Sequence, residues 1–283
     1  MIERPFSIPR DDGTTIRGDL RLLEGETPVG AIVVAHGFKG FKDWGFFPYL
    51  CQRLAEDGHA VVSFNFSLNG IGDDPTEFTE LENFAQNTFS RDIDEILIVL
   101  EQVRSGGILA VPPTRLGLFG HSRGGGEVLI AARDDECLDA LVTWAGLATF
   151  ERWSDEVRKE WAEKGRIHVL NARTGQQMPL DHTLLDDFKA NRERLDIEVA
   201  AATLKELSWL IVHGEEDASV PISDADRLVA ANPRVEVERI PSAGHAFEAL
   251  HPFQGSTPEL ERAIGATSRH FGLHLLPEKT PTD

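Results

Sequence analysis

The chain has 283 residues, of which 41% are hydrophobic and 27% are charged, and these ordinary proportions exclude collagen-like, coiled-coil and disordered proteins. This length is enough for one large domain or two small ones, with a core that needs no disulfide or metal. The net charge of −19 repels phosphate backbones and anionic lipid, so we expect neither nucleic acid nor a membrane surface as a partner.

The chain shows no sign of a secreted or membrane protein. Its N-terminus is charged and lacks the apolar run of a signal peptide. No stretch approaches the ~18 apolar residues of a membrane span. Cys51 and Cys137 each stand beside apolar residues and are expected to be buried free thiols. We therefore expect a cytoplasmic protein.

The first third of the chain predicts the edge and the centre of a sheet. Alternating apolar residues on both sides of a turn at 11–13 predict two antiparallel strands. The continuously apolar, β-branched run 31–37 predicts a strand buried on both faces, as in a parallel sheet covered by helices. A helix at 46–57 and a second buried strand at 59–66 follow.

Strand and helix patterns go on alternating to the end of the chain. Strands are predicted at 115–120, 138–145, 208–214 and 235–240, and helices at 75–105, 125–133, 224–231 and 258–271. This alternation indicates an α/β protein with a mostly parallel central sheet flanked by helices.

Residues 149–206 interrupt the alternation with a charged, tryptophan-bearing segment. A hairpin is predicted at 166–178, with Gly175 at the turn position of positive φ. A structureless loop of this length is uncommon in a compact domain. We therefore expect an inserted cap at 149–206 on a core domain formed by 1–148 and 207–283.

The segment GHSRG at 120–124 matches the pattern GxSxG. An apolar strand precedes it and a helical pattern follows, which is the context of a nucleophile elbow carrying Ser122. The alternative is a glycine-rich turn that binds phosphate. The segment lacks the Lys-Ser/Thr pair of a phosphate-binding loop and the glycine spacing of a dinucleotide loop.

A serine nucleophile needs a base and an acid that orients the base. Asp217 follows the strand 208–214, where Glu215 and Glu216 compete for the role of the acid. His245 follows the last predicted strand, and His251 is its nearest rival. In this arrangement His245 accepts the Ser122 proton through Nε2, and Asp217 holds the Nδ1–H group.

Two backbone amides are the expected donors to the oxyanion of an acyl transfer. The Phe38 N–H lies just after the strand 31–37, and the Arg123 N–H lies at the start of the helix after Ser122. Gly37 is expected to shape the backbone beside the substrate.

Four motifs together resemble the serine hydrolases of the α/β-hydrolase fold: HGFKG (36–40), GHSRGG (120–125), HGEED (213–217) and GHAF (244–247). The insertion after the sixth strand resembles the capped bacterial carboxylesterases, including the cinnamoyl/feruloyl esterase branch. This resemblance implies a triad of Ser122, Asp217 and His245 and no cofactor. Arg123 departs from the Gln or Met of many relatives. Its guanidinium is expected either to bind an acidic substrate group or to pair with a cap carboxylate.

Three tryptophans and two histidines are further candidates for the site. Trp144, Trp153 and Trp161 are candidate walls of a substrate pocket, with an ordinary place in the core as the alternative. His270 and His274 have the i, i+4 spacing of metal ligands, but no third ligand is evident in the sequence, so we expect no metal site.

The sequence thus predicts a hydrolase that cleaves short-chain or aryl carboxylic esters through an acyl-enzyme, with a small-molecule ester as its partner. One alternative is an aminopeptidase-like serine peptidase or amidase, which Asp155 or Glu156 facing the site would favour. The other alternative is a binding protein with this fold and no catalytic activity. A homodimer is left open.

Overall fold

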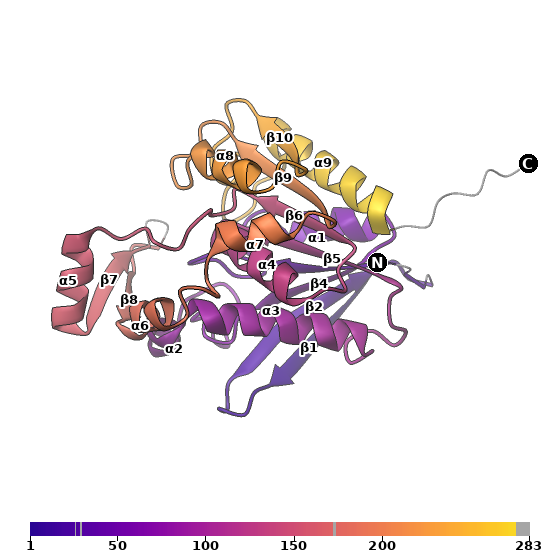
Figure 1. Cartoon of the computed structure of the whole chain (residues 1–283). Helices are drawn as coiled ribbons and strands as arrows, with labels where there is room; N and C mark the ends of the chain where they lie inside the picture. Colours follow the sequence, from indigo (N-terminus) through magenta and orange to yellow (C-terminus); the bar gives the residue numbers. More distant parts are fainter. Residues whose placement is uncertain (26, 29, 172–173, 276–283) are drawn as a thin grey trace, which may run out of the picture.

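The computed structural model describes residues 1–25, 27–28, 30–171 and 174–275, which form a central sheet with helices on both faces (Figure 1). The strands are β1 Ile2–Pro9, β2 Thr15–Leu22, β3 Gly30–Ala35, β4 Ala60–Asn65, β5 Arg115–His121, β6 Ala140–Trp144, β7 Arg166–Leu170, β8 Gln177–Asp181, β9 Ser208–Gly214 and β10 Glu236–Ile240. The helices are α1 Phe47–Glu56, α2 Leu81–Gln86, α3 Phe89–Arg104, α4 Arg123–Asp134, α5 Asp155–Lys164, α6 Thr183–Ala190, α7 Ile197–Thr203, α8 Ile222–Ala231 and α9 Pro258–Leu275.

The predicted mostly parallel sheet is confirmed. In the described part of the chain, eight strands follow the order β1-β2-β4-β3-β5-β6-β9-β10. The β1–β2 and β2–β4 pairs are antiparallel, and every other pair is parallel. Strands β3, β4 and β6 are buried along their whole length, as their continuous apolar runs require. The carboxyl ends of β3, β5, β9 and β10 therefore meet at one edge.

Helices cover both faces of the sheet. Helices α1 and α9 pack on one face, and α3, α4 and α8 pack on the other. The single helical region expected at 75–105 consists of two helices, α2 and α3. Thr88 ends the continuity because its hydroxyl accepts the Arg91 amide and caps α3.

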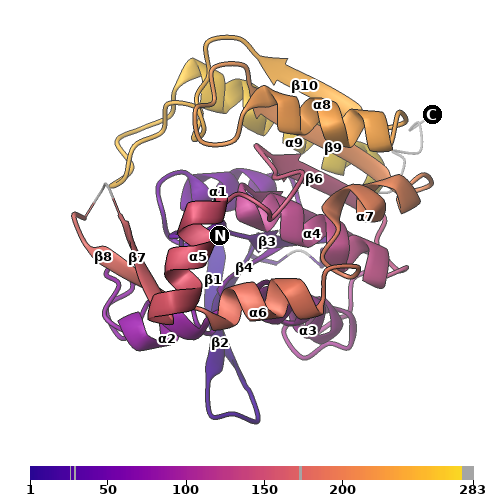
Figure 2. The ribbon, with the colours of Figure 1, turned by 60° about the vertical axis from the view of Figure 1, so that its left-hand side comes forward.

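Part of the segment 149–206 projects from the sheet, and Figure 2 brings it forward. It consists of α5, the antiparallel pair β7–β8 and α6. Helix α2 packs against β8 and α3 packs against α6, whereas α7 lies against α4 and α8 of the core. Gly175 has φ of 73°, but residues 172 and 173 of the predicted turn lie outside the described residues. We call α5, β7, β8 and α6 the projecting segment.

One cysteine prediction is wrong. Cys51 is buried in α1, but Cys137 is exposed in the turn between α4 and β6. The Cys137 amide donates to the Asp135 carboxylate in this turn, which holds the thiol outside the core. Among the described helices, none combines the length and hydropathy needed to cross a bilayer.

Candidate active site

Ser122 stands between β5 and α4 with φ of 59° and ψ of −122°, a strained backbone for a residue other than glycine. The flanking glycines make this turn sterically feasible. A Cβ on Gly120 would lie 2.4 Å from the Gly124 carbonyl oxygen, and a Cβ on Gly124 would lie 2.4 Å from the His36 carbonyl oxygen. The strand, tight turn and helix therefore have the form of a nucleophile elbow.

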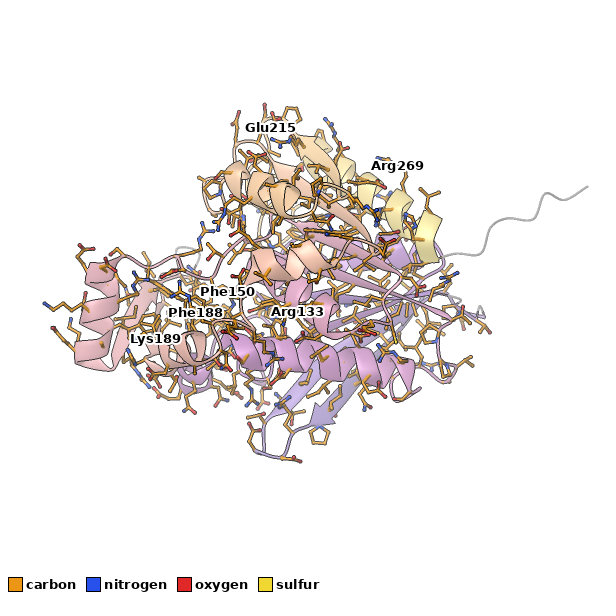
Figure 3. All side chains as sticks on the ribbon, in the orientation of Figure 1. Arg133, Phe150, Phe188, Lys189, Glu215 and Arg269 are labelled. Atoms are coloured by element: carbon orange, nitrogen blue, oxygen red, sulfur yellow. The ribbon has the colours of Figure 1, made fainter. Side chains whose placement is uncertain are left out.

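The fold brings Ser122, His245 and Asp217 into one hydrogen-bonded chain. His245 Nε2 lies 2.9 Å from Ser122 Oγ, and His245 Nδ1 lies 2.7 Å from Asp217 Oδ2. The competing groups lie elsewhere. Glu215 is exposed at the outer edge of the molecule (Figure 3), and His251 Nδ1 accepts the Gly45 amide. The hydroxyl can donate to Nε2 while Nδ1–H donates to the carboxylate.

Asp217 is held as an ionised acceptor. Its Oδ1 accepts the backbone amides of Ser219 and Val220, each at 2.8 Å. Burial opposes ionisation of this carboxyl, but the hydrogen bond from His245 and the two amides outweigh burial, so the pKa of Asp217 is lowered. The geometry fixes the carboxylate for orienting His245.

Gly37 brings the loop after β3 against the elbow. A Cβ on Gly37 would lie 2.8 Å from both the His121 carbonyl oxygen and Ser122 Cβ, and 3.3 Å from Arg123 N. His36 Nδ1 donates to the Gly37 carbonyl at 2.9 Å. Burial lowers the pKa of His36 to about 4, so the ring is neutral at pH 7. The Phe38 amide follows this loop, and the Arg123 amide opens α4 without an intrahelical acceptor.

Two cavities in the described part of the chain meet at Ser122. The first, of about 420 Å³, is lined by Gly37, Lys39, Trp44, Asn171, His245 and Ala246 among others. The second, of about 210 Å³, is lined by Phe38, Phe89, Arg123, Phe150, Trp153 and Leu184 among others. Figure 3 shows Phe150 where the projecting segment meets the core, and its ring stacks on Phe89 with centroids 4.1 Å apart. We call these two spaces the first cavity and the second cavity.

Of the three candidate wall tryptophans, only Trp153 lines a cavity. Trp144 is fully buried, packs against the α1 and α9 face, and donates its Nε1–H to Thr267 at 2.8 Å. Trp161 is fully buried within the projecting segment and donates to the Leu180 carbonyl. Both rings have a structural partner for their only donor, so their assignment as pocket walls is corrected.

The expectation for the Arg123 side chain is also corrected. Its Nη2 bonds Asp92 of α3 at 2.5 Å, and its Nε lies 3.0 Å from Glu127 Oε1 of α4. Neither carboxyl belongs to the segment 149–206. Glu127 was detectable in the sequence as the i+4 partner of Arg123. Asp92 was detectable only as a carboxyl within the apolar face of α3, beside Phe89 and Ile93.

The fold places a third candidate ligand, which the sequence did not show, beside His270 and His274. Glu236 of β10 approaches them, and one ligand atom from each residue lies within 4.8 Å of the others. This trio lies on α9 and β10, and none of its members is among the described residues that line the two cavities at Ser122. We assign it no part in the chemistry at Ser122.

Gly124→Ala is expected to destabilise the fold by about 1–3 kcal/mol, since the new methyl group collides with backbone that cannot move freely. Gly272→Ala is the matched control because it makes the same change in α9, where a Cβ meets nothing within 4 Å. The control is expected to be neutral or slightly stabilising. Urea unfolding measures both, and equal free energies of unfolding would contradict the steric account.

The comparisons with known proteins agree with the fold. Residues 32–258, most of the chain, match the Alpha/beta hydrolase family. The chain is 26% identical over 268 residues to a Bacillus subtilis (strain 168) protein named "Uncharacterized peptidase YuxL", with 89% of this chain and 38% of that protein aligned. The chain thus spans less than half the length of the curated relatives it matches.

Solved structures share the fold at low sequence identity. Est1E from Butyrivibrio proteoclasticus with bound ferulic acid has a TM-score of 0.71 and 17% identity, over 95% of this chain and 98% of that chain. An esterase domain from a Rhodothermus marinus protein has a TM-score of 0.65 and 18% identity, over 97% of this chain and 100% of that chain. With the family match over residues 32–258, these observations show that the chain belongs to the Alpha/beta hydrolase family.

Proposed function

We propose that this hydrolase cleaves carboxylic esters with Ser122 as its nucleophile, through an acyl-enzyme intermediate. The observation that carries the proposal is a pair of hydrogen-bond contacts, from Ser122 Oγ to His245 Nε2 and from His245 Nδ1 to Asp217 Oδ2. These three side chains lie at the carboxyl edge of the sheet, and Ser122 lines both cavities.

Each step of the proposed reaction uses a group that the fold holds in place. Ser122 Oγ attacks the ester carbonyl carbon while its proton passes to His245 Nε2, and Asp217 stabilises the imidazolium. The Phe38 and Arg123 amides donate to the carbonyl oxygen as it becomes negative. His245 returns the proton to the departing alkoxide, which leaves the acyl group on Oγ. Water, deprotonated by His245, then releases the acid and restores Ser122.

The cavities favour an ester over a peptide that carries a free amino terminus. An aminopeptidase needs a carboxylate to bind the substrate ammonium, but none of the described residues that line either cavity is acidic. Asp155 is exposed on α5 and pairs with Arg158. The name of the Bacillus subtilis relative nevertheless favours a peptidase as the second candidate.

A matched substrate panel separates the candidates. We expect p-nitrophenyl acetate and butyrate to be hydrolysed at least ~10²-fold faster, as kcat/KM, than p-nitroanilides of the same acids. Aminoacyl p-nitroanilides and a lactone complete the panel. Preference for aminoacyl anilides would establish the peptidase instead. Fluorophosphonate labelling of the protein with no turnover of any member would favour a silent binding protein.

A further inference from the structure

The guanidinium of Arg123 lies between two aromatic rings. Its Cζ is 5.0 Å from the centroid of Phe38 and 5.5 Å from the centroid of Phe89. A cation over ring faces is attracted by the negative face of each ring. Phe38 also packs on Phe84 of α2, with centroids 5.5 Å apart. The Phe38 ring thus contacts both Phe84 and Arg123.

Buried polar groups fix the guanidinium in this position. Asp92 and Glu127 have fully buried side chains, and the Arg123 side chain is only 12% exposed. Asn87 Nδ2 lies 3.0 Å from both Asp92 oxygens, so Asn87 donates to the same carboxylate that Arg123 bonds. A buried arginine with a bonded carboxylate resists displacement, because an unpaired buried charge is costly.

Asp92 and Glu127 both lie against the Arg123 guanidinium, Asp92 at its Nη2 and Glu127 at its Nε. Two ionised carboxylates are acceptors only and repel each other, whereas a protonated carboxyl donates to its neighbour. Burial and the Asp92 charge raise the pKa of Glu127 well above its usual value. Burial also raises the pKa of Asp92, but Arg123 and Asn87 oppose that rise. Glu127 is therefore the carboxyl of this pair that holds a proton more readily, and Asp92 is the main anionic partner of Arg123.

We propose that Arg123 is a positioning residue, whose guanidinium, held by Asp92 and Glu127, clamps the Phe38 ring and so fixes the Phe38 amide as an oxyanion donor. This inference rests on the proposed function. The Arg123 amide is oriented by α4, whereas the Phe38 amide belongs to the loop after β3, to which the clamp adds a side-chain anchor. The clamp thus links the two residues that carry the proposed donor amides, because the Arg123 side chain contacts the Phe38 ring.

The clamp also determines the class of substrate that suits the second cavity. The Arg123 guanidinium already pairs with Asp92, so a substrate carboxylate could bind the guanidinium only by displacing a fully buried partner. The remaining walls include Phe89, Phe150, Trp153 and Leu184. The second cation of the lining, Arg152, is paired with Asp224. The cavity therefore suits an uncharged apolar or aromatic group of the ester, and it disfavours a group that carries a carboxylate.

The test of the clamp measures the rate of fluorophosphonate labelling, which depends on Ser122, His245 and the oxyanion donors but on no particular substrate. Arg123→Met is expected to slow labelling at least ~10-fold, since loss of a whole oxyanion donor costs about 10²–10³ in rate. For a neutral p-nitrophenyl ester, kcat is expected to fall in parallel while KM changes less than ~3-fold. Arg104→Met, at the far end of α3, is the matched control.

Two carboxyl variants separate positioning from general stability. Asp92→Asn leaves Arg123 without its anionic partner and is expected to slow labelling about as much as Arg123→Met. Glu127→Gln mimics a protonated carboxyl, so labelling is expected to stay at least ~5-fold faster than in Asp92→Asn. If Arg123→Met does not fold, Arg123→Lys, which keeps the charge but lacks the planar fork, is expected to label at least ~3-fold slower than wild type.

The outcomes distinguish this inference from the proposed function. A folded wild-type protein that is not labelled overturns the proposed function. A labelled wild type with unchanged rates in Arg123→Met and Asp92→Asn overturns the clamp alone. As a second arm, we expect p-nitrophenyl butyrate to be cleaved at least ~10-fold faster, as kcat/KM, than mono-p-nitrophenyl succinate. Equal rates would overturn the assignment of the second cavity to uncharged groups.

Discussion

Replacing Ser122 with alanine is expected to lower kcat/KM for p-nitrophenyl acetate by at least ~10³-fold and to abolish fluorophosphonate labelling. The change removes Oγ, the atom that lies 2.9 Å from His245 Nε2, and leaves no acceptor for the acyl group. The backbone bonds of the elbow remain, because the Ser122 amide donates to the Trp144 carbonyl and its carbonyl accepts from Gly126. Initial rates and mass spectrometry of the labelled protein measure the two effects.

Ser242 provides the matched control for this variant. It also has positive φ, 58° against 59° for Ser122, and it is exposed in the turn after β10. Ser242→Ala therefore also places a new alanine at positive φ, and we expect its activity to stay within ~3-fold of wild type. Activity of Ser122→Ala within ~10-fold of wild type would point to another nucleophile, with Ser122 then serving only the turn.

The strands and the contact among Ser122, Asp217 and His245 were predictable because both depend on short stretches of chain. Continuous apolar runs indicated β3, β4 and β6, and a parallel sheet brings the carboxyl ends of its strands to one edge. Residues just after β5, β9 and β10 had to lie near one another for that reason. The order Ser122, Asp217, His245 then selected the three side chains that the fold brings into contact.

The side-chain environments were not predictable in the same way. Both faces of β6 are covered by helices, so burial alone could not tell that Trp144 faces α9 and Thr267 instead of a cavity. Arg123 meets Asp92 from a helix 31 positions earlier in the chain, a distance over which sequence spacing carries no signal. Glu236 likewise reaches His270 and His274 only because β10 lies beside α9.

Asp217→Asn is expected to lower kcat by about 10³–10⁴, although the side chain keeps its shape. The reason lies in the two backbone amides that donate to Oδ1, from Ser219 and Val220. They require an oxygen at that position, so the asparagine must place its NH₂ group at the Oδ2 position, facing His245 Nδ1. An NH₂ group is a donor, so Nδ1 becomes the acceptor and Nε2 carries the proton. In that tautomer His245 cannot accept the Ser122 proton.

Glu216→Gln is the matched control for this carboxyl-to-amide change. Glu216 is the neighbouring acid in the same turn, it is exposed, and its backbone amide bonds the Ala243 carbonyl in either variant. We expect the control to keep kcat within ~2-fold, because its side chain touches no member of the triad. Stopped-flow or steady-state assays with p-nitrophenyl acetate measure both variants. If Glu216→Gln lost activity while Asp217→Asn kept it, the acid of the triad would be misassigned. We expect the reverse, because at Asp217 two fixed amides dictate which end of the new amide faces the histidine.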